Sequence, residues 1–94
     1  MSDVNSVTVS GRLTRDPELR QTKSGANVAS FRLANNLAKK TNFFDVSLWG
    51  RSAETINQYG GKGSWISVTG RLEQEEWEDR DGNKRTSYRI TSEN

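Results

Sequence analysis

The chain contains no cysteine and no histidine, and it has a single proline among its 94 residues. Without cysteine it can form neither a disulfide framework nor a thiolate nucleophile. Without histidine it lacks the commonest general base and the commonest metal ligand. These absences argue against an enzyme, and no cofactor or metal is expected.

Apolar residues are also scarce, with Leu, Ile, Val and Phe together making up 18 of the 94 residues. No apolar run is long enough to span a bilayer, and the N-terminal MSDVNSVTVS lacks the basic-then-apolar order of a signal peptide. The net charge is only +2, which argues against disorder. We therefore expect one small cytoplasmic domain over residues 1–94, with no membrane partner and a thin core that oligomerisation would supplement.

Charge is distributed unevenly along the chain. Residues 1–72 carry ten Lys and Arg against five Asp and Glu, whereas residues 73–94 carry four against seven. A basic body is typical of proteins that bind polyanions. The acidic segment between Glu73 and Asp81 is interpreted as a solvated charge run, and a hydrolase or nuclease built on these carboxylates is the alternative.

Alternation of apolar and polar residues predicts five strands. They are expected around Val7–Leu13, Ala29–Leu33, Asn42–Gly50, Ile66–Leu72 and Thr86–Ile90. On the first four strands alternation predicts that the core faces carry Val7, Val9, Leu13, Ala29, Phe31, Leu33, Phe44, Val46, Leu48, Ile66, Val68 and Leu72. On the last strand Thr86, Tyr88 and Ile90 are expected to face inward, and Arg85 and Arg89 outward.

Between the third and fourth strands the sequence predicts a short helix. Ser52 is a suitable cap, Ala53, Ile56 and Tyr59 form the apolar stripe, and Gly60 ends the helix. A turn is predicted at Arg15–Glu18 and a polar connection at Asn35–Asn42. The resulting class is all-β, and its order is that of an OB-fold, a five-stranded Greek-key barrel whose second and third strands form the usual binding face.

The stretch TNFFDVSLWGR, Thr41–Arg51, carries aromatic residues on a polar strand face. Alternation places Phe43 and Trp49 on that face together with Asp45, for which Arg32 on the neighbouring strand is a possible partner. Flat rings on a wet face flanked by arginine suit stacking on nucleic-acid bases. The alternative is that a loop, the helix or a partner subunit covers the rings.

Four segments resemble the bacterial single-stranded DNA-binding protein family over nearly the whole chain. They are Asn5–Arg20, Ser24–Asn36, Thr41–Tyr59 and Lys62–Arg85, and they include the specific patterns G-R-L-x-x-D-P-E-x-R and W-G-x-x-A-E. The resemblance implies an OB-fold that assembles into homotetramers. It also implies binding and protection of single-stranded DNA without sequence preference, in replication, recombination and repair.

Carried over position by position, the resemblance implies seven DNA-binding residues. The stacking aromatics are Phe43, Trp49 and Trp77, and the basic residues are Arg12, Arg20, Arg51 and Lys62. Arg32 is added as an eighth because its strand neighbours the aromatic one. Trp65 has no stacking role in the family and is interpreted as covering an exposed sheet face or lying in a subunit contact.

The chain departs from the family pattern at several positions. The loop after Asn36 is short and offers no aromatic, and Gly60 stands where the family often has leucine. Glu73, Glu75 and Glu76 stand where some relatives are more basic. Members normally continue into a linker and an acidic tip that recruits replication and repair proteins, so the chain is interpreted as the binding core without that tail. A relative whose barrel mainly binds partner proteins is the remaining alternative.

Overall fold

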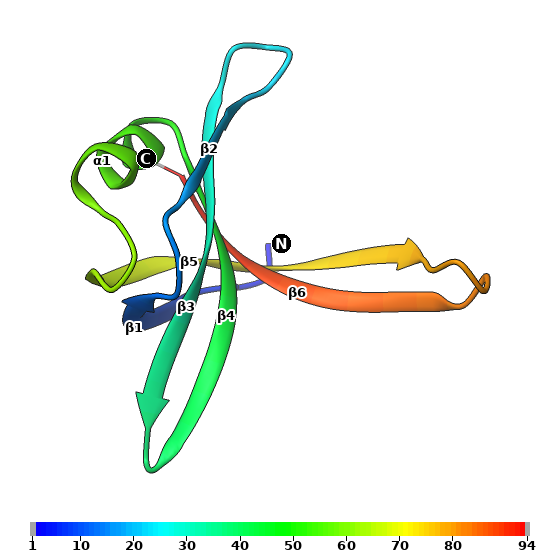
Figure 1. Cartoon of the computed structure of the whole chain (residues 1–94). Helices are drawn as coiled ribbons and strands as arrows, with labels where there is room; N and C mark the ends of the chain where they lie inside the picture. Colours follow the sequence, from blue (N-terminus) through cyan, green and yellow to red (C-terminus); the bar gives the residue numbers. More distant parts are fainter. Residues whose placement is uncertain (1, 94) are drawn as a thin grey trace.

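The computed structural model describes residues 2–93, so Met1 and Asn94, the two ends of the predicted domain, lie outside the described residues. The elements in chain order are β1 (Val7–Leu13), β2 (Glu18–Gln21), β3 (Asn27–Leu37), β4 (Lys40–Trp49), α1 (Arg51–Tyr59), β5 (Trp65–Glu78) and β6 (Lys84–Glu93). Strands dominate the structure, and the one helix lies beside them (Figure 1). The all-β class with one short helix is confirmed.

Five of the strands form a closed ring. Neighbours follow the order β1-β5-β6-β4-β3-β2, and a further pairing between β1 and β3 joins the two sides of the sheet. β4 and β6 run parallel, from Val46 opposite Ile90 to Trp49 opposite Glu93, whereas the other pairs are antiparallel. When the five ring strands are counted in chain order, the helix follows the third, β4, and precedes the fourth, β5, as predicted for an OB-fold.

The sequence prediction misses β2. All four of its residues are exposed, so they show no alternation of apolar and polar side chains. β2 continues the line of β1 along β3, because Leu13 pairs with Leu33 and Arg20 pairs with Val28. A strand with water on both faces leaves no apolar period in the sequence, so no strand is predicted after the turn at Arg15–Glu18, which overlaps β2 only at Glu18.

The core fills the inside of the ring with residues from every predicted strand and from the helix. Its buried members are Leu13, Ala29, Phe31, Leu33, Val46, Leu48, Ala53, Ile56, Val68 and Ile90. Each was placed on a core face by its period of two or by the helical stripe. The alternation therefore locates the core correctly wherever a strand belongs to the ring.

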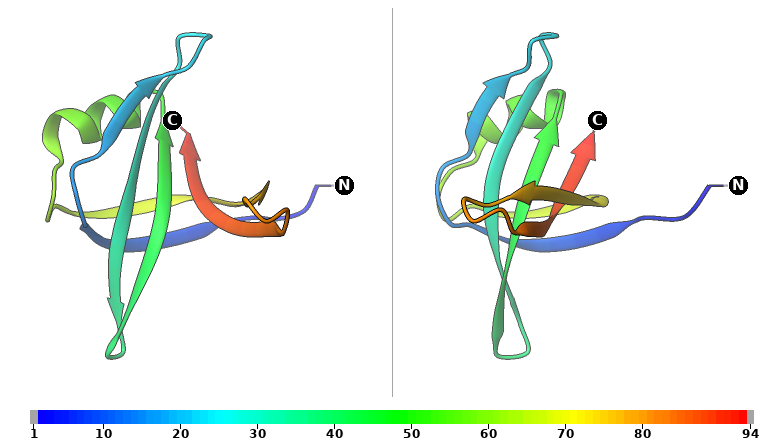
Figure 2. Two further views of the ribbon diagram at one scale, coloured as in Figure 1. Left: turned by 45° about the vertical axis from the view of Figure 1, so that its right-hand side comes forward. Right: turned by 90° about the vertical axis from the view of Figure 1, so that its right-hand side faces the viewer.

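β5 and β6 extend beyond the ring as a two-stranded arm, which we define as residues 73–89. The arm projects from the rest of the molecule (Figures 1 and 2). Leu72 at its base and Thr86 and Tyr88 on β6 are exposed, although alternation placed them inward. The prediction is wrong for these residues because the arm has no second layer to cover either face.

The helix cap lies two residues earlier in the chain than predicted. Gly50, with φ 69°, is the N-cap instead of Ser52, and its carbonyl accepts the N–H groups of Ala53 and Glu54. Ala53 and Ile56 are buried as predicted, while Tyr59 is 77% exposed and does not join the core. Because Gly50 follows Trp49 directly, this tight start fixes the chain where the aromatic strand ends.

The hairpin between β3 and β4 is tighter than the polar connection predicted over Asn35–Asn42. The two strands stay paired until Leu37 opposite Lys40, so that two residues, Ala38 and Lys39, make the turn, both with positive φ. The polar side chains pair across the strands, with the Asn42 amide donating to Asn35 Oδ1 at 3.3 Å. Polar composition here marks an exposed hairpin and not a loop.

Two glycines lie where ring strands pass each other at close range. A Cβ at Gly11 would lie 2.5 Å from the carbonyl oxygen of Ala34, and a Cβ at Gly70 would collide with the carbonyl oxygen of Thr91. Both obstacles are backbone atoms, which cannot turn aside as a side chain can. The closure of the ring therefore depends on the missing side chains at these two positions.

Candidate nucleic-acid interface

One continuous sheet surface, here called the outer face, collects five of the eight predicted site residues. It is the solvent side of β2, β3, β4 and β6 together with the adjoining part of β5, and it carries Arg20, Arg32, Phe43, Trp49 and Trp77. Strand register explains the grouping, because Trp49 lies opposite Val28, which lies opposite Arg20, and Arg32 lies opposite Asp45. Residues directly opposite each other in a sheet share one face.

Phe43 and Arg32 form one end of this face. Phe43 is 52% exposed, and the Arg32 guanidinium carbon lies 5.0 Å from the centre of its ring. Arg32 Nε is also 3.9 Å from Asp45 Oδ1, which confirms the predicted partnership. Bases stack on guanidinium planes as well as on aromatic rings. The pair therefore offers a flat, cationic surface at the edge of the sheet.

A groove of about 590 Å³ crosses the outer face beside Trp49. It is lined by residues of five strands, among them Arg20, Ser47, Trp49, Glu73, Glu75, Arg89 and Thr91. Trp49 is partly exposed, so its ring belongs to the groove wall and not to the core. An aromatic wall with cationic groups on two sides suits a planar ligand that carries negative charge.

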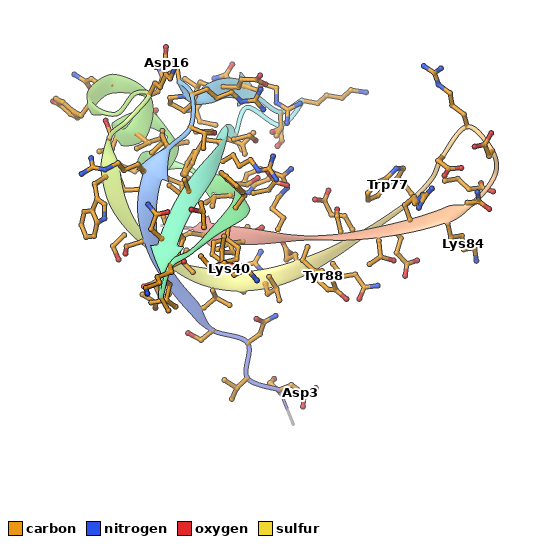
Figure 3. All side chains as sticks on the ribbon, turned by 60° about the horizontal axis from the view of Figure 1, so that its bottom comes forward. Asp3, Asp16, Lys40, Trp77, Lys84 and Tyr88 are labelled. Carbon is orange, nitrogen blue, oxygen red and sulfur yellow. The ribbon has the colours of Figure 1, made fainter. Side chains whose placement is uncertain are left out.

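Trp77 lies on the arm, apart from the ring. It is 50% exposed and pairs across the arm with Arg85. The period of two along β5 places it on the same face as Glu73 and Glu75, which line the groove. Figure 3 shows Trp77 and Tyr88 on opposite sides of the arm. The outer face thus continues from the groove along the arm.

The acidic residues of the arm are exposed, as expected for a charge run, and several form ion pairs. Glu75 pairs with Arg89 at 2.9 Å, Asp79 with Arg85 at 2.8 Å, and Glu73 with Arg71 at 3.4 Å. A hydrogen bond from the Thr91 hydroxyl, followed by the charge of Arg71, lowers the pKa of Glu73. The carboxylates of Glu73, Glu75 and Asp79 are therefore engaged with arginines of the arm and its base.

Asp79 organises the tip of the arm. Its Oδ1 accepts the backbone N–H groups of Asp81 and Asn83, each at 3.0 Å, and its Oδ2 accepts Arg85 Nε. The hydrogen bond from Asn83 is the largest cause, and that from Arg85 the next, of a pKa below the ordinary 3.8. The unfolded tip binds the proton more readily, so this stabilisation is complete above pH 3.8 and is lost as pH falls through the folded pKa.

We accordingly expect the arm tip to loosen at low pH before the ring does. Heteronuclear NOE values of the Asp81 and Gly82 amides should fall as the pH is lowered below 3.8, while that of Val46 in the ring stays high. In Asp79→Asn the tip should be less ordered at neutral pH and should show no such transition. A tip equally ordered at pH 2 and pH 6 in the parent chain contradicts the assignment.

Of the other three predicted basic residues, Arg12 borders the outer face, because it lies opposite Ala34, which lies opposite Phe43. Lys62 and Arg51 lie near α1 instead. Arg12 Nη1 donates to the Gly63 carbonyl at 3.0 Å and lies opposite Trp65 across β1 and β5. The backbone N–H of Lys62 donates to Asp16 Oδ1 at 2.8 Å. Arg51 lines a second groove, between α1 and β5, together with Tyr59 and Trp65.

The structure adds outer-face residues that the predicted site lacks. Arg85 lies opposite Trp77, and Arg89 lies in the groove with Ser47 beneath it. Alternation already placed Arg85 and Arg89 outward on the last strand. The missing signal was the parallel pairing of β6 with β4, which no local pattern in the sequence encodes.

Two further findings bear on the kind of site. Among residues 2–93, no group of three or more Cys, His, Asp or Glu side chains is placed to hold a metal ion. Within the same residues no helix has the length and apolar character needed to cross a membrane.

Comparison with known proteins gives consistent matches. The Single-strand binding protein family matches residues 4–94. Proteins named "Single-stranded DNA-binding protein" from Treponema pallidum and Borreliella burgdorferi are each 42% identical over the whole chain, which covers 57% and 69% of their lengths. The protein of that name from Helicobacter hepaticus is 46% identical over 95% of the chain and 58% of its own length. The chain therefore spans little more than half of two of these three relatives, and it belongs to the single-strand binding protein family.

Proposed function

We propose that the chain binds single-stranded DNA without sequence preference and protects it during replication, recombination and repair. The observation that carries the proposal is the outer face, where Phe43, Trp49 and Trp77 are exposed or partly exposed. Each of these rings lies near an arginine on a neighbouring strand. The names of the relatives point to the same ligand. The proposed role is binding by one domain, not catalysis.

In this mechanism bases stack on the three rings while arginines hold the phosphates. Stacking contributes about 1–3 kcal/mol per base and tolerates any base, because every base has a flat face. Arg20 beside Trp49 and Arg32 beside Phe43 place positive charge next to each ring. Duplex DNA hides the faces of its bases and should bind poorly.

We further propose that the DNA strand leaves the outer face toward α1. The aromatic strand ends at Trp49, and Arg51 follows after one residue at the start of the helix. Lys62 lies in the loop that follows α1, and Arg12 is joined to this loop through the Gly63 carbonyl. Their role in the proposal is phosphate attraction along a continuing path.

A homo-oligomer, most simply a homotetramer, is the proposed assembly. Within residues 2–93, β1 pairs with β3 at Arg12 and Leu13, and the Asn35 side chain donates to the Ser10 carbonyl at 2.7 Å. The remaining edge along Val7–Val9 is open for pairing with another chain. Trp65 is 60% exposed on the neighbouring β5 and offers apolar area for such a contact. Light scattering that gives the mass of one 10.6 kDa chain at micromolar concentration contradicts this assembly.

The cellular setting follows from the proposed binding of single-stranded DNA. The protein would act in the cytoplasm on the DNA of the nucleoid. Replication and repair proteins would be its partners where the full-length protein carries an acidic C-terminal tail.

Intrinsic tryptophan fluorescence tests the proposed function directly. Oligothymidine should quench the emission of Trp49 and Trp77, because stacked bases quench indole, whereas a duplex of equal length should have little effect at the same concentration. Unchanged emission at saturating oligothymidine and low salt would count against stacking on these rings. Binding to oligothymidine and duplex with equal affinity would indicate a purely electrostatic site.

A further inference from the structure

Arg89 occupies a defined position at the bottom of the outer-face groove. Its Nε lies 2.9 Å from Glu75 Oε1, and its Nη1 donates to Ser47 Oγ at 2.9 Å. Its side chain is 30% exposed, less than those of the other ion-paired arginines, at 42% for Arg71, 52% for Arg32 and 59% for Arg85. Arg89 is therefore oriented before any ligand arrives.

The position of Arg89 relates it to the stacking ring. Ser47, which accepts its hydrogen bond, is two residues before Trp49 on the same face of β4, about 7 Å along the strand. A nucleotide whose base stacks on Trp49 could therefore bring a phosphate to Arg89. The two bonds described above use two of the five N–H donors of the guanidinium. The remaining donors suit a phosphate, which arginine binds through two parallel hydrogen bonds.

Glu75 opposes a phosphate at this position. Its side chain is 51% exposed, and it faces the same guanidinium that a phosphate would bind. Ion pairs open to solvent are weak and exchange readily. A phosphate can thus replace Glu75, or bind beside it at the cost of repulsion between two negative charges. In both cases the carboxylate lowers the affinity for a polyanion.

We propose that Arg89 is a phosphate-binding residue of the groove and that Glu75 is a built-in competitor for it. This inference rests on the proposed single-stranded DNA binding and adds residues outside the eight predicted from the sequence. The carboxylate acts as a phosphate substitute that keeps Arg89 oriented in the free protein. It also limits how tightly a DNA strand is held.

Anisotropy of a fluorescein-labelled oligothymidine, measured with the full chain at several salt concentrations, tests the inference. Glu75→Gln keeps an acceptor for Arg89 Nε and removes only the charge. It should tighten binding several-fold and steepen the salt dependence. Arg89→Gln should weaken binding by about tenfold and reduce the slope of log K against log salt by about 0.7, the value of one phosphate contact.

The matched control is Glu54→Gln, which makes the same change in net charge on α1, where Glu54 accepts a hydrogen bond from Asn27. It should alter affinity by less than Glu75→Gln does. In the double variant Glu75→Gln/Arg89→Gln, the gain from Glu75→Gln should disappear, because the gain requires Arg89. This coupling separates a phosphate site from a general effect of charge.

Several outcomes overturn the inference. One is a Glu75→Gln variant that binds no tighter than Glu54→Gln, and another is an increase in affinity that survives in the double variant. A third is a folded Arg89→Gln variant with an unchanged salt slope, which would leave Arg89 as a structural link between β6 and β4. If Arg89→Gln does not fold, the comparison of Glu75→Gln with Glu54→Gln decides. Failure of the parent chain to bind oligothymidine would instead refute the proposed function itself.

Discussion

A chain in which Phe43, Trp49 and Trp77 are all replaced by alanine should lose single-stranded DNA affinity by a factor of at least about one hundred. Each ring contributes about 1–3 kcal/mol through stacking, so their combined loss is at least about 3 kcal/mol. The slope of log K against log salt should change little, because stacking releases no counterions whereas phosphate contacts do. Anisotropy titrations of labelled oligothymidine at several salt concentrations measure both quantities.

Tyr88→Ala is the control for this experiment. Tyr88 is an exposed aromatic, but it lies on the opposite side of the arm from Trp77 and not on the outer face. Its removal should leave the affinity nearly unchanged. The melting temperature of Trp49→Ala should stay close to that of the parent chain, since the ring is a groove wall. A triple variant that folds and still binds within threefold of the parent would exclude the outer face as the stacking surface.

Replacing Gly70 by alanine should destabilise the fold by about 3 kcal/mol or more, at the upper end of the usual cost of overpacking. The added Cβ would collide with the Thr91 carbonyl oxygen and lie 2.9 Å from the Thr91 carbonyl carbon. The backbone of Thr91 cannot retreat, because Thr91 is paired in the sheet with Ser47 on one side and Arg71 on the other. For a domain of this size such a loss is a large part of the total stability.

Urea unfolding of Gly70→Ala and Gly61→Ala provides the comparison. A Cβ at Gly61 would meet only Asp16 Oδ1, at 3.3 Å, and Asp16 has a side chain that can move. Gly61→Ala should therefore be neutral or slightly stabilising, as alanine is when it restricts the unfolded chain without strain. If both variants unfold at the same urea concentration as the parent, the close crossing of β5 and β6 is not a constraint on the fold.

The alternation of side chains was a reliable guide where a strand has one wet face and one dry face. It placed Leu33 and Val46 in the core and Phe43 on the outer face, and the structure confirms all three. It failed for Tyr88, because the arm alternates in the same way without any core beneath it. It also missed β2, whose residues are all exposed.

The predicted basic residues show a different limit. Both Arg20 and Arg51 are exposed, and no sequence pattern tells them apart. In the structure Arg20 lines the groove beside Trp49, whereas Arg51 lies between α1 and β5. Which side a charge occupies depends on the path of the helix and its loops. Arg89 was overlooked for a related reason, since only the distant pairing of β6 with β4 brings it to Ser47.

That parallel pairing also sets the order in which the molecule can form. Val46 meets Ile90 and Trp49 meets Glu93 across more than forty intervening residues, so the ring stays open until almost the entire described chain has left the ribosome. Contacts between such distant residues are slow to form, and domains dominated by them fold in milliseconds to seconds. A nascent chain that ends before β6 has Trp49 but not Arg89 or Thr91, and it has a β4 edge without a partner. During synthesis the aromatic strand is therefore exposed to wrong pairing before its groove exists.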